Sequence, residues 1–297
     1  MPRESCQEGS STVWISLQRL LCPMTRLFGL ALLFIASTWS LTGRAAEPDI
    51  VELYKAKTIV TGMREETRLK GFGDCLRSVL LKVSGDQRAL DDPRLVPVLA
   101  KAPDYVTAYH YHDRMSGIPT HDEQGTRDRP YDLSCDFSRD KVDAALASLG
   151  RKPWLAPRPR IALFVSVRNE PAAFVLAADD RDAAIMREAF ADAAGALAIP
   201  IRFPKRQDLQ RIGLDAGRLP RIGMPVLDAF AGHIGGSHAL AGTVVWSEAQ
   251  NCWIAEWRFF DGTDTAIWQF RATSFDKIFQ NAMRGAAQIL SSNGDPG

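Results

Sequence analysis

Histidines are the residues of this chain whose spacing comes nearest to a metal site. His110 and His112 are separated by one residue, which places both imidazoles on one face of a strand, and His121 follows in the next loop. A zinc site needs three or four protein ligands, and no cysteine or carboxylate obviously joins the three histidines. The pattern therefore favours surface histidines on an edge strand, and a metal-dependent hydrolase with an unrecognised site stays an alternative.

Other patterns that could do chemistry have simpler structural explanations. The sequence contains no nucleophile elbow, no phosphate-binding loop, no HExxH motif and no dinucleotide-binding fingerprint. Ser84-Gly85-Asp86 offers a hydroxyl and a carboxylate, but no base that would activate the hydroxyl accompanies them. The glycine-rich residues 232–236 end a predicted helix, where glycine acts as a stop signal. The sequence thus names no catalytic residue and no cofactor.

Aromatic side chains are the better candidates for a binding surface. Tyr109 and Tyr111 alternate with the two histidines, and Trp154 lies among prolines. Aromatic residues are enriched in the cores of protein interfaces, so each of the three could contact a ligand or a partner. Trp154 could instead fix two domains together, because a buried tryptophan removes a large apolar area from water. We favour this second role for Trp154.

Cysteines carry a further prediction. Cys75 and Cys135 both fall on the apolar face of a predicted element, so both should point into the same core. In an oxidising compartment they could form a disulfide, which would contribute ~3–4 kcal/mol by closing a long loop; the alternative is two buried thiols. Cys252 is left over and is expected to be buried. The absence of CxxC spacing argues against a zinc or thioredoxin-type site.

The first half of the chain contains both helical and strand patterns. The clearest strand is 131–137, in which apolar and polar residues alternate strictly. The clearest helix is 64–83, whose apolar residues recur every three or four positions and which Gly85 would end. The predicted order is strand 50–60, helix 64–83, helix 92–100, strand 106–113, strand 131–137 and helix 138–149.

The second half begins with a nearly continuous apolar run, 161–167, typical of a central buried strand. Three strands near the end of the chain are joined by connections too short for a parallel crossover, so they form an antiparallel meander. The predicted order is strand 161–167, helix 182–198, strand 199–203, helix 225–234, strands 239–246, 252–260 and 266–271, and a terminal helix 274–290 capped by Ser274.

Three prolines, at positions 153, 157 and 159, mark the boundary between the halves, because proline continues neither a helix nor a central strand. We predict an α/β (α+β) protein with two small mixed-sheet domains, the second holding the meander and the C-terminal helix. The predicted divisions are a signal region over 1–45, an N-terminal domain over 46–150, a proline-rich linker over 151–160, a C-terminal domain over 161–291 and a disordered tail over 292–297.

Residues 25–41 have the composition of a cleavable export signal. Arg26 precedes a mostly apolar run, and the small residues Gly43 and Ala45 fit the pattern that signal peptidases cut after. Met24 would be the natural start of this signal, so we exclude residues 1–23 from the fold. The run is short for a membrane span, which needs ~20 apolar residues, although an uncleaved anchor is the alternative. The predicted location is the periplasm of a Gram-negative bacterium.

The charge balance bears on two classes of partner. The chain has 36 basic and 35 acidic residues, and removal of residues 1–45, with four Arg and two Glu, leaves 32 and 33. Such a balance gives no support for nucleic acid as a partner, nor for an anionic membrane surface.

Several stretches together resemble a family of bacterial proteins, domain of unknown function family 2066. They include the end of the first helix at Gly85-Asp86, Asp92-Pro93 and Trp154 before the apolar strand. Members of that family look like exported envelope proteins, which is what the resemblance implies here. The second half is also similar to the N-terminal domain of TolB and to outer-membrane lipoproteins of the curli-secretion kind, which are binding and assembly modules; this is an analogy of fold alone.

These observations predict a non-enzymatic binding or assembly module of the cell envelope with an envelope protein as its partner. Two alternatives remain open. One is the metal-dependent or other hydrolase, and the other is a binder of small ligands in the cleft between the domains near Trp154.

Overall fold

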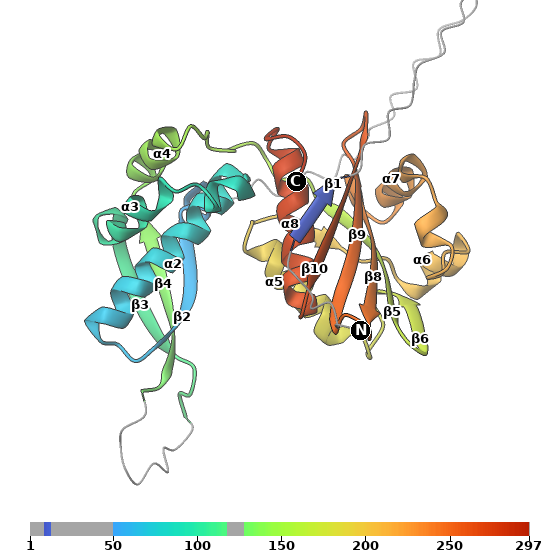
Figure 1. The fold of residues 1–297 in the computed structure, drawn as a ribbon, viewed down its shortest axis with the longest axis horizontal. Coiled ribbons are helices and arrows are strands. Elements are labelled where there is room, and N and C mark those ends of the chain that lie inside the picture. The colour runs from blue at the N-terminus through green and yellow to red at the C-terminus, as the bar shows by residue number, and fades with distance from the viewer. Residues whose placement is uncertain (1–8, 13–49, 118–127, 297) are drawn as a thin grey trace, which may run out of the picture.

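The computed structural model describes residues 9–12, 50–117 and 128–296. The predicted export signal and His121 lie outside these residues. Residues 149–160 contain neither helix nor strand and separate an N-terminal group of elements from a C-terminal group (Figure 1). One strand, Gly9–Thr12, comes from residues 1–23, which were excluded from the fold above, and it pairs with the sheet of the C-terminal group. The fold is α+β with two sheets and a C-terminal helix, as the sequence predicts. No helix within the described ranges is both long enough and apolar enough to cross a bilayer.

The N-terminal group is a three-stranded antiparallel sheet with helices packed on one face. The strand order is β2-β4-β3, from β2 (Lys55–Thr61), β3 (Val106–Asp113) and β4 (Pro130–Phe137). Alternate residues of β4, among them Leu133 and Cys135, are buried beneath α2 (Glu65–Ser84), while Asp132 and Ser134 point to the open face. The remaining helices are α1 (Ile50–Leu53), α3 (Leu95–Ala100) and α4 (Arg139–Ser148).

One predicted strand of this group is partly wrong. The segment predicted to be extended over 50–60 begins with the single helical turn α1, and the strand starts only at Lys55. The reason is that the adjacent residues Leu53 and Tyr54 are both buried. A strand would send neighbouring side chains to opposite faces, so the chain must turn to bury both.

The C-terminal group is a seven-stranded mixed sheet between two layers of helices. The order is β1-β10-β9-β8-β5-β6, and β7 pairs with β5 beside β6. In Figure 1 the helices α5 and α8 lie on one side of this sheet, and α6 and α7 lie on the other. The bounds are β1 (Gly9–Thr12), β5 (Ile161–Asn169), β6 (Ala172–Val175), α5 (Ala184–Gly195), β7 (Ile201–Arg202), α6 (Arg206–Arg211), α7 (Met224–His233), β8 (His238–Ser247), β9 (Cys252–Phe260), β10 (Thr265–Ala272) and α8 (Phe275–Leu290).

Burial explains which of these elements the sequence could reveal. The first seven residues of β5 are all buried, because helices cover both faces of the sheet, and this produces the continuous apolar run. The predicted meander is present as β8-β9-β10, with antiparallel pairing throughout. Strand β6 and helix α6 were not predicted, since each is short and half exposed. Helix α6 has Leu209 as its one buried residue, which leaves no periodic pattern to read.

Candidate functional site

A pocket of about 640 Å³ lies where the two groups of elements meet. Its walls come from the segment after α2, from the connection between the domains and from the segment after α8. The lining residues are Asp86, Arg88, Gly150, Arg151, Lys152, Pro153, Trp154, Leu155, Ala156, Ser291, Ser292 and Asn293. We call this the junction pocket. Its volume falls in the range typical of small-molecule sites.

Gly85 directs the chain from α2 into the pocket. It ends the helix with a φ of +69°, a left-handed conformation that glycine adopts without steric cost. A Cβ atom at this position would lie 2.7 Å from the Oγ of Ser291 and 3.0 Å from the ring of Trp154. Gly85 is therefore needed both for the turn and for the close approach of the C-terminal domain.

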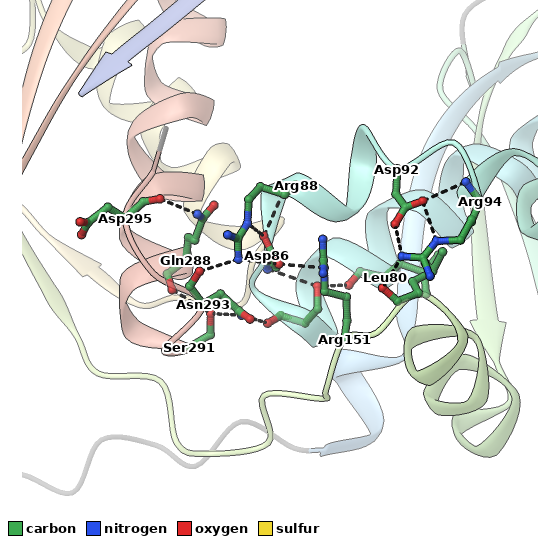
Figure 2. A network of polar contacts seen from close by, with 12 residues as sticks. Leu80, Asp86, Arg88, Asp92, Arg94, Arg151, Gln288, Ser291, Asn293 and Asp295 are labelled. Carbon is green, nitrogen blue, oxygen red and sulfur yellow. Dashed lines mark hydrogen bonds and ion pairs between the residues drawn. The ribbon is translucent and has the colours of Figure 1, made fainter.

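Asp86 follows as a fully buried carboxylate, and Arg88 is its first partner (Figure 2). Oδ1 of Asp86 accepts hydrogen bonds from the backbone N–H of Arg88 at 3.0 Å and from its Nε at 2.9 Å, and Oδ2 accepts from Nη2 at 3.1 Å. The carboxylate and guanidinium thus form a bidentate pair. This hydrogen bonding raises the pKa of Arg88, whose side chain is about half exposed toward the pocket.

Arg151 supplies a second guanidinium to the same carboxylate. Its Nε lies 2.8 Å from Oδ2 of Asp86, although the angle is not that of a hydrogen bond. Two cations share one anion, so this cluster of Asp86, Arg88 and Arg151 carries an excess of one positive charge. Lys152 is exposed and adds another at the rim of the pocket.

The segment after α8 completes the pocket, and Figure 2 shows it beside Arg88. Arg88 Nη2 donates to the carbonyl of Asn293 at 2.5 Å, and Asn293 Nδ2 donates to the carbonyl of Ser84 at 3.0 Å and to Ser291 Oγ at 2.7 Å. Gln288 Nε2 in turn donates to the carbonyl of Asp295 at 2.7 Å. Within the segment 292–297, for which the sequence predicts a disordered tail, Asn293 bonds to the N-terminal domain and Asp295 to α8.

The turn at Asp86 has a close copy six residues later. Asp92 accepts from the backbone N–H and Nε of Arg94 through Oδ1, and from Nη2 through Oδ2, as Figure 2 shows. Hydrogen bonding from Arg94 lowers the pKa of Asp92 to about 2. Arg94 then donates to the carbonyls of Ser148 and Leu149 at the end of α4. Arg94 therefore ties two elements of one domain together, whereas Arg88 ties the two domains to each other.

Trp154 lies between the domains and is 8% exposed. Its backbone N–H donates to the carbonyl of Val83 at 2.7 Å, and the guanidinium of Arg158 lies over its ring, 4.1 Å from the centroid. Arg158 itself is buried and donates to backbone carbonyls of three segments, those of Lys82, Trp154 and Leu197, at 2.7, 3.1 and 3.1 Å. This arrangement fits the role of Trp154 as a contact that fixes the domains, with only part of its ring left to line the pocket.

The histidines and tyrosines of β3 lie on other surfaces. His110 and His112 are exposed on the open face of the sheet, where His112 Nδ1 lies 4.0 Å from Oδ2 of Asp132. Among the described residues no group of three His, Cys, Asp or Glu side chains could hold a metal ion. Tyr109 and Tyr111 point to the helical face, where Tyr109 packs against Phe72 and Tyr111 against Tyr131. Neither the two histidines nor these two tyrosines of β3 line the junction pocket.

The two core cysteines are in direct contact. The Sγ atoms of Cys75 on α2 and Cys135 on β4 lie 2.9 Å apart, and both side chains are fully buried thiols. The hydrogen bond with Cys135 and burial raise the pKa of Cys75, which keeps it protonated. Their oxidation to a disulfide stays a prediction. Cys252 is buried, as expected, but it is disulfide-bonded and not left over.

Sequence reasoning missed the cluster around Asp86. A signal for it exists in hindsight, since Asp86-Gln87-Arg88 and Asp92-Pro93-Arg94 repeat one Asp-x-Arg pattern. An aspartate that accepts from the backbone two residues on forms a local turn, and an arginine at that position can close the pair. The pattern alone does not say which of the two turns faces the other domain.

Comparison with protein families gives a match over residues 48–155 to a family described as domain of unknown function (DUF8605). The match corrects the expectation from sequence: the resemblance to family 2066 is wrong, because the model that matches is that of a different family. The motifs behind that resemblance, such as Gly85 and Asp92-Pro93, are helix ends and turns that many α/β chains share. A search of curated proteins gives no match.

Proposed function

We propose that this chain is an exported, non-enzymatic binding module of the cell envelope that holds its ligand in the junction pocket. The observation that carries the proposal is the construction of the pocket from both domains. Its floor is the buried carboxylate of Asp86, and its walls are residues 150–156 and 291–293. A polar pocket of this volume between two domains is a common place for a ligand.

The contacts around the pocket support a site that is formed before the ligand arrives. Arg158 donates to carbonyls of α2, of the linker and of the segment after α5, and Asn293 donates to Ser84 across the domain boundary. A site whose walls are already fixed loses less conformational entropy on binding. This favours the interpretation of the chain as a binder of small ligands over its interpretation as a module that binds an envelope protein.

Export rests on the sequence of residues 25–45, which lie outside the described residues. Osmotic-shock fractionation of the native cell tests it, with the mass of the purified chain as a second readout. We expect the protein in the periplasmic fraction, with the mass of a chain that begins at Ala46 or Glu47. Cytoplasmic recovery of a chain that retains residues 25–45 would refute the export part of the proposal.

Binding at the pocket is tested by a photoreactive amino acid in place of Lys152 at the pocket rim, in cells that make the protein naturally. Ile185, which is 70% exposed on α5 and does not line the pocket, is the control position. We expect irradiation to add mass to the protein labelled at 152 and not to the protein labelled at 185. Filling the pocket with Ala156→Trp should abolish the adduct, and an adduct that survives this substitution would contradict the proposal.

A further inference from the structure

Charge distinguishes the junction pocket from the groove on the open face of the N-terminal sheet. Among its lining residues, all of which the structure describes, three are cationic, Arg88, Arg151 and Lys152, and Asp86 is the one anion. The net formal charge of the lining is therefore +2. By contrast, the groove on the open face of the sheet is lined by four Lys or Arg and four Asp or Glu side chains, so its lining is neutral apart from His110.

The buried carboxylate also orients the two guanidinium groups. Asp86 occupies Nε and Nη2 of Arg88, and it faces Nε of Arg151. Nη1 of Arg88 and both Nη atoms of Arg151 make no hydrogen bond within the described part of the chain. A guanidinium fixed along one edge presents its remaining N–H groups in a defined direction, which suits a planar or tetrahedral oxyanion.

We propose that the junction pocket binds a small soluble molecule through a carboxylate or phosphate group. The inference rests on the proposed function and names the chemistry of its ligand. Arg88 and Arg151 donate to the anionic group, Lys152 adds charge at the rim, and Asp86 is a positioning residue that holds the two guanidiniums side by side. Asp86 neutralises only one of the two positive charges of Arg88 and Arg151. A bound anion would neutralise the other, so the electrostatic energy favours the anion-bound state.

Titration calorimetry of the full-length mature chain tests the proposal, with inorganic phosphate and succinate as probes at constant ionic strength. We expect saturable binding of at least one of the two. Lys152→Ala should weaken it about tenfold, because a charge-assisted contact is lost. Within the described residues the exposed Lys152 side chain makes no hydrogen bond or ion pair, so the substitution should leave the fold intact. Lys70→Ala, which removes another exposed charge, this one on α2, should leave the affinity unchanged.

A second variant and a second kind of probe complete the test. Arg151→Gln should also reduce the affinity, and its circular dichroism spectrum and melting temperature report whether the fold is kept. Binding to phosphatidylglycerol vesicles without binding of phosphate or succinate would overturn a soluble ligand, and so would no binding of any probe. If no probe binds but the light-induced adduct at position 152 forms, the inference of an anionic ligand is refuted while the proposed function still stands.

Discussion

Arg158 is buried, and no carboxylate of the described residues pairs with it. The structure balances its charge with backbone carbonyls at 2.7–3.4 Å and with the face of Trp154. Burial lowers the pKa of Arg158 to about 10, so the side chain is still cationic at neutral pH. A guanidinium can serve several carbonyls at once because its N–H groups point in fixed, divergent directions.

We therefore expect Arg158→Lys to destabilise the protein by about 2–4 kcal/mol, since one ammonium cannot reach the carbonyls of Lys82, Trp154 and Leu197 together. Equilibrium unfolding in urea measures the change. Arg160→Lys is the control, because Arg160 is only half-buried and makes one long bond of 3.4 Å to Gly235. That control should lie within ~0.5 kcal/mol of wild type. Equal losses in both variants would show that the carbonyl contacts of Arg158 contribute little.

The thiols of Cys75 and Cys135 lead to a second prediction at this scale. If the protein is exported, oxidation of the pair by a disulfide donor should link α2 to β4 across 60 residues and contribute about 4 kcal/mol. We expect a reductant to lower the melting temperature of the wild type by roughly 10 °C more than that of Cys75→Ala/Cys135→Ala. The double variant corrects for any other effect of the reductant on the protein. Equal shifts in the two proteins would mean that the pair stays reduced.

At the scale of elements, two glycines make room for two tryptophans in the core of the C-terminal domain. Gly242 of β8 lies directly opposite Trp257 of β9, and a Cβ atom on Gly242 would come within 2.0 Å of the indole. In the same way, a Cβ atom on Gly285 of α8 would lie 2.5 Å from the ring of Trp268. No local pattern in the sequence marks the two glycines that accommodate these tryptophans.

Gly242→Ala should consequently destabilise the protein by about 2–3 kcal/mol through overpacking, as measured by thermal or urea unfolding. Gly232→Ala is the matched change, since Gly232 lies in helix α7 and nothing is within 4 Å of its would-be Cβ atom. Alanine is the better helix former, so this control should be neutral or stabilising by up to ~1 kcal/mol. A Gly242→Ala protein as stable as the control would mean that Trp257 can shift without cost.

Helices and strands could be predicted from the sequence where one face of the element is buried and the other is exposed to solvent. Helix α8 was predicted almost to the residue, because its apolar stripe is regular and Ser274 caps it by accepting from the N–H of Lys277. Strand β4 was equally clear from its alternation. Prediction failed for α1 and β6, where too few residues are buried to set a period. Such segments take their conformation from the neighbours they pack against.

At the scale of the whole molecule, the sequence offered a cleft between the domains near Trp154 as one alternative, but it did not predict the residues from distant segments that line the junction pocket. Its defining contacts join residues 205 and 209 positions apart, Arg88 with Asn293 and Ser84 with Asn293. Local patterns carry no information on such pairs. The sequence did predict the boundary near Trp154 and favoured a role for this residue between the domains, because prolines and a large aromatic side chain are local features.

The same long-range contacts imply that the last residues of the chain help to hold the domains together. Asn293→Ala removes the hydrogen bonds from Nδ2 to Ser84 and Ser291 while leaving Arg158 and Trp154 in place. Each neutral hydrogen bond contributes ~1 kcal/mol, so the open state of the junction should become about fivefold to tenfold more populated. Limited proteolysis within residues 149–160 measures that population when opening is fast compared with cleavage.

Asn169→Ala, a change of the same kind at an exposed position away from the pocket, should be cleaved at the wild-type rate. If Asn293→Ala is also cleaved at that rate, Arg158 and Trp154 alone hold the domains together. If it is cleaved faster and an added anion slows the cleavage, the pocket and the domain contact are thermodynamically linked, because a ligand that binds only the closed junction must stabilise it.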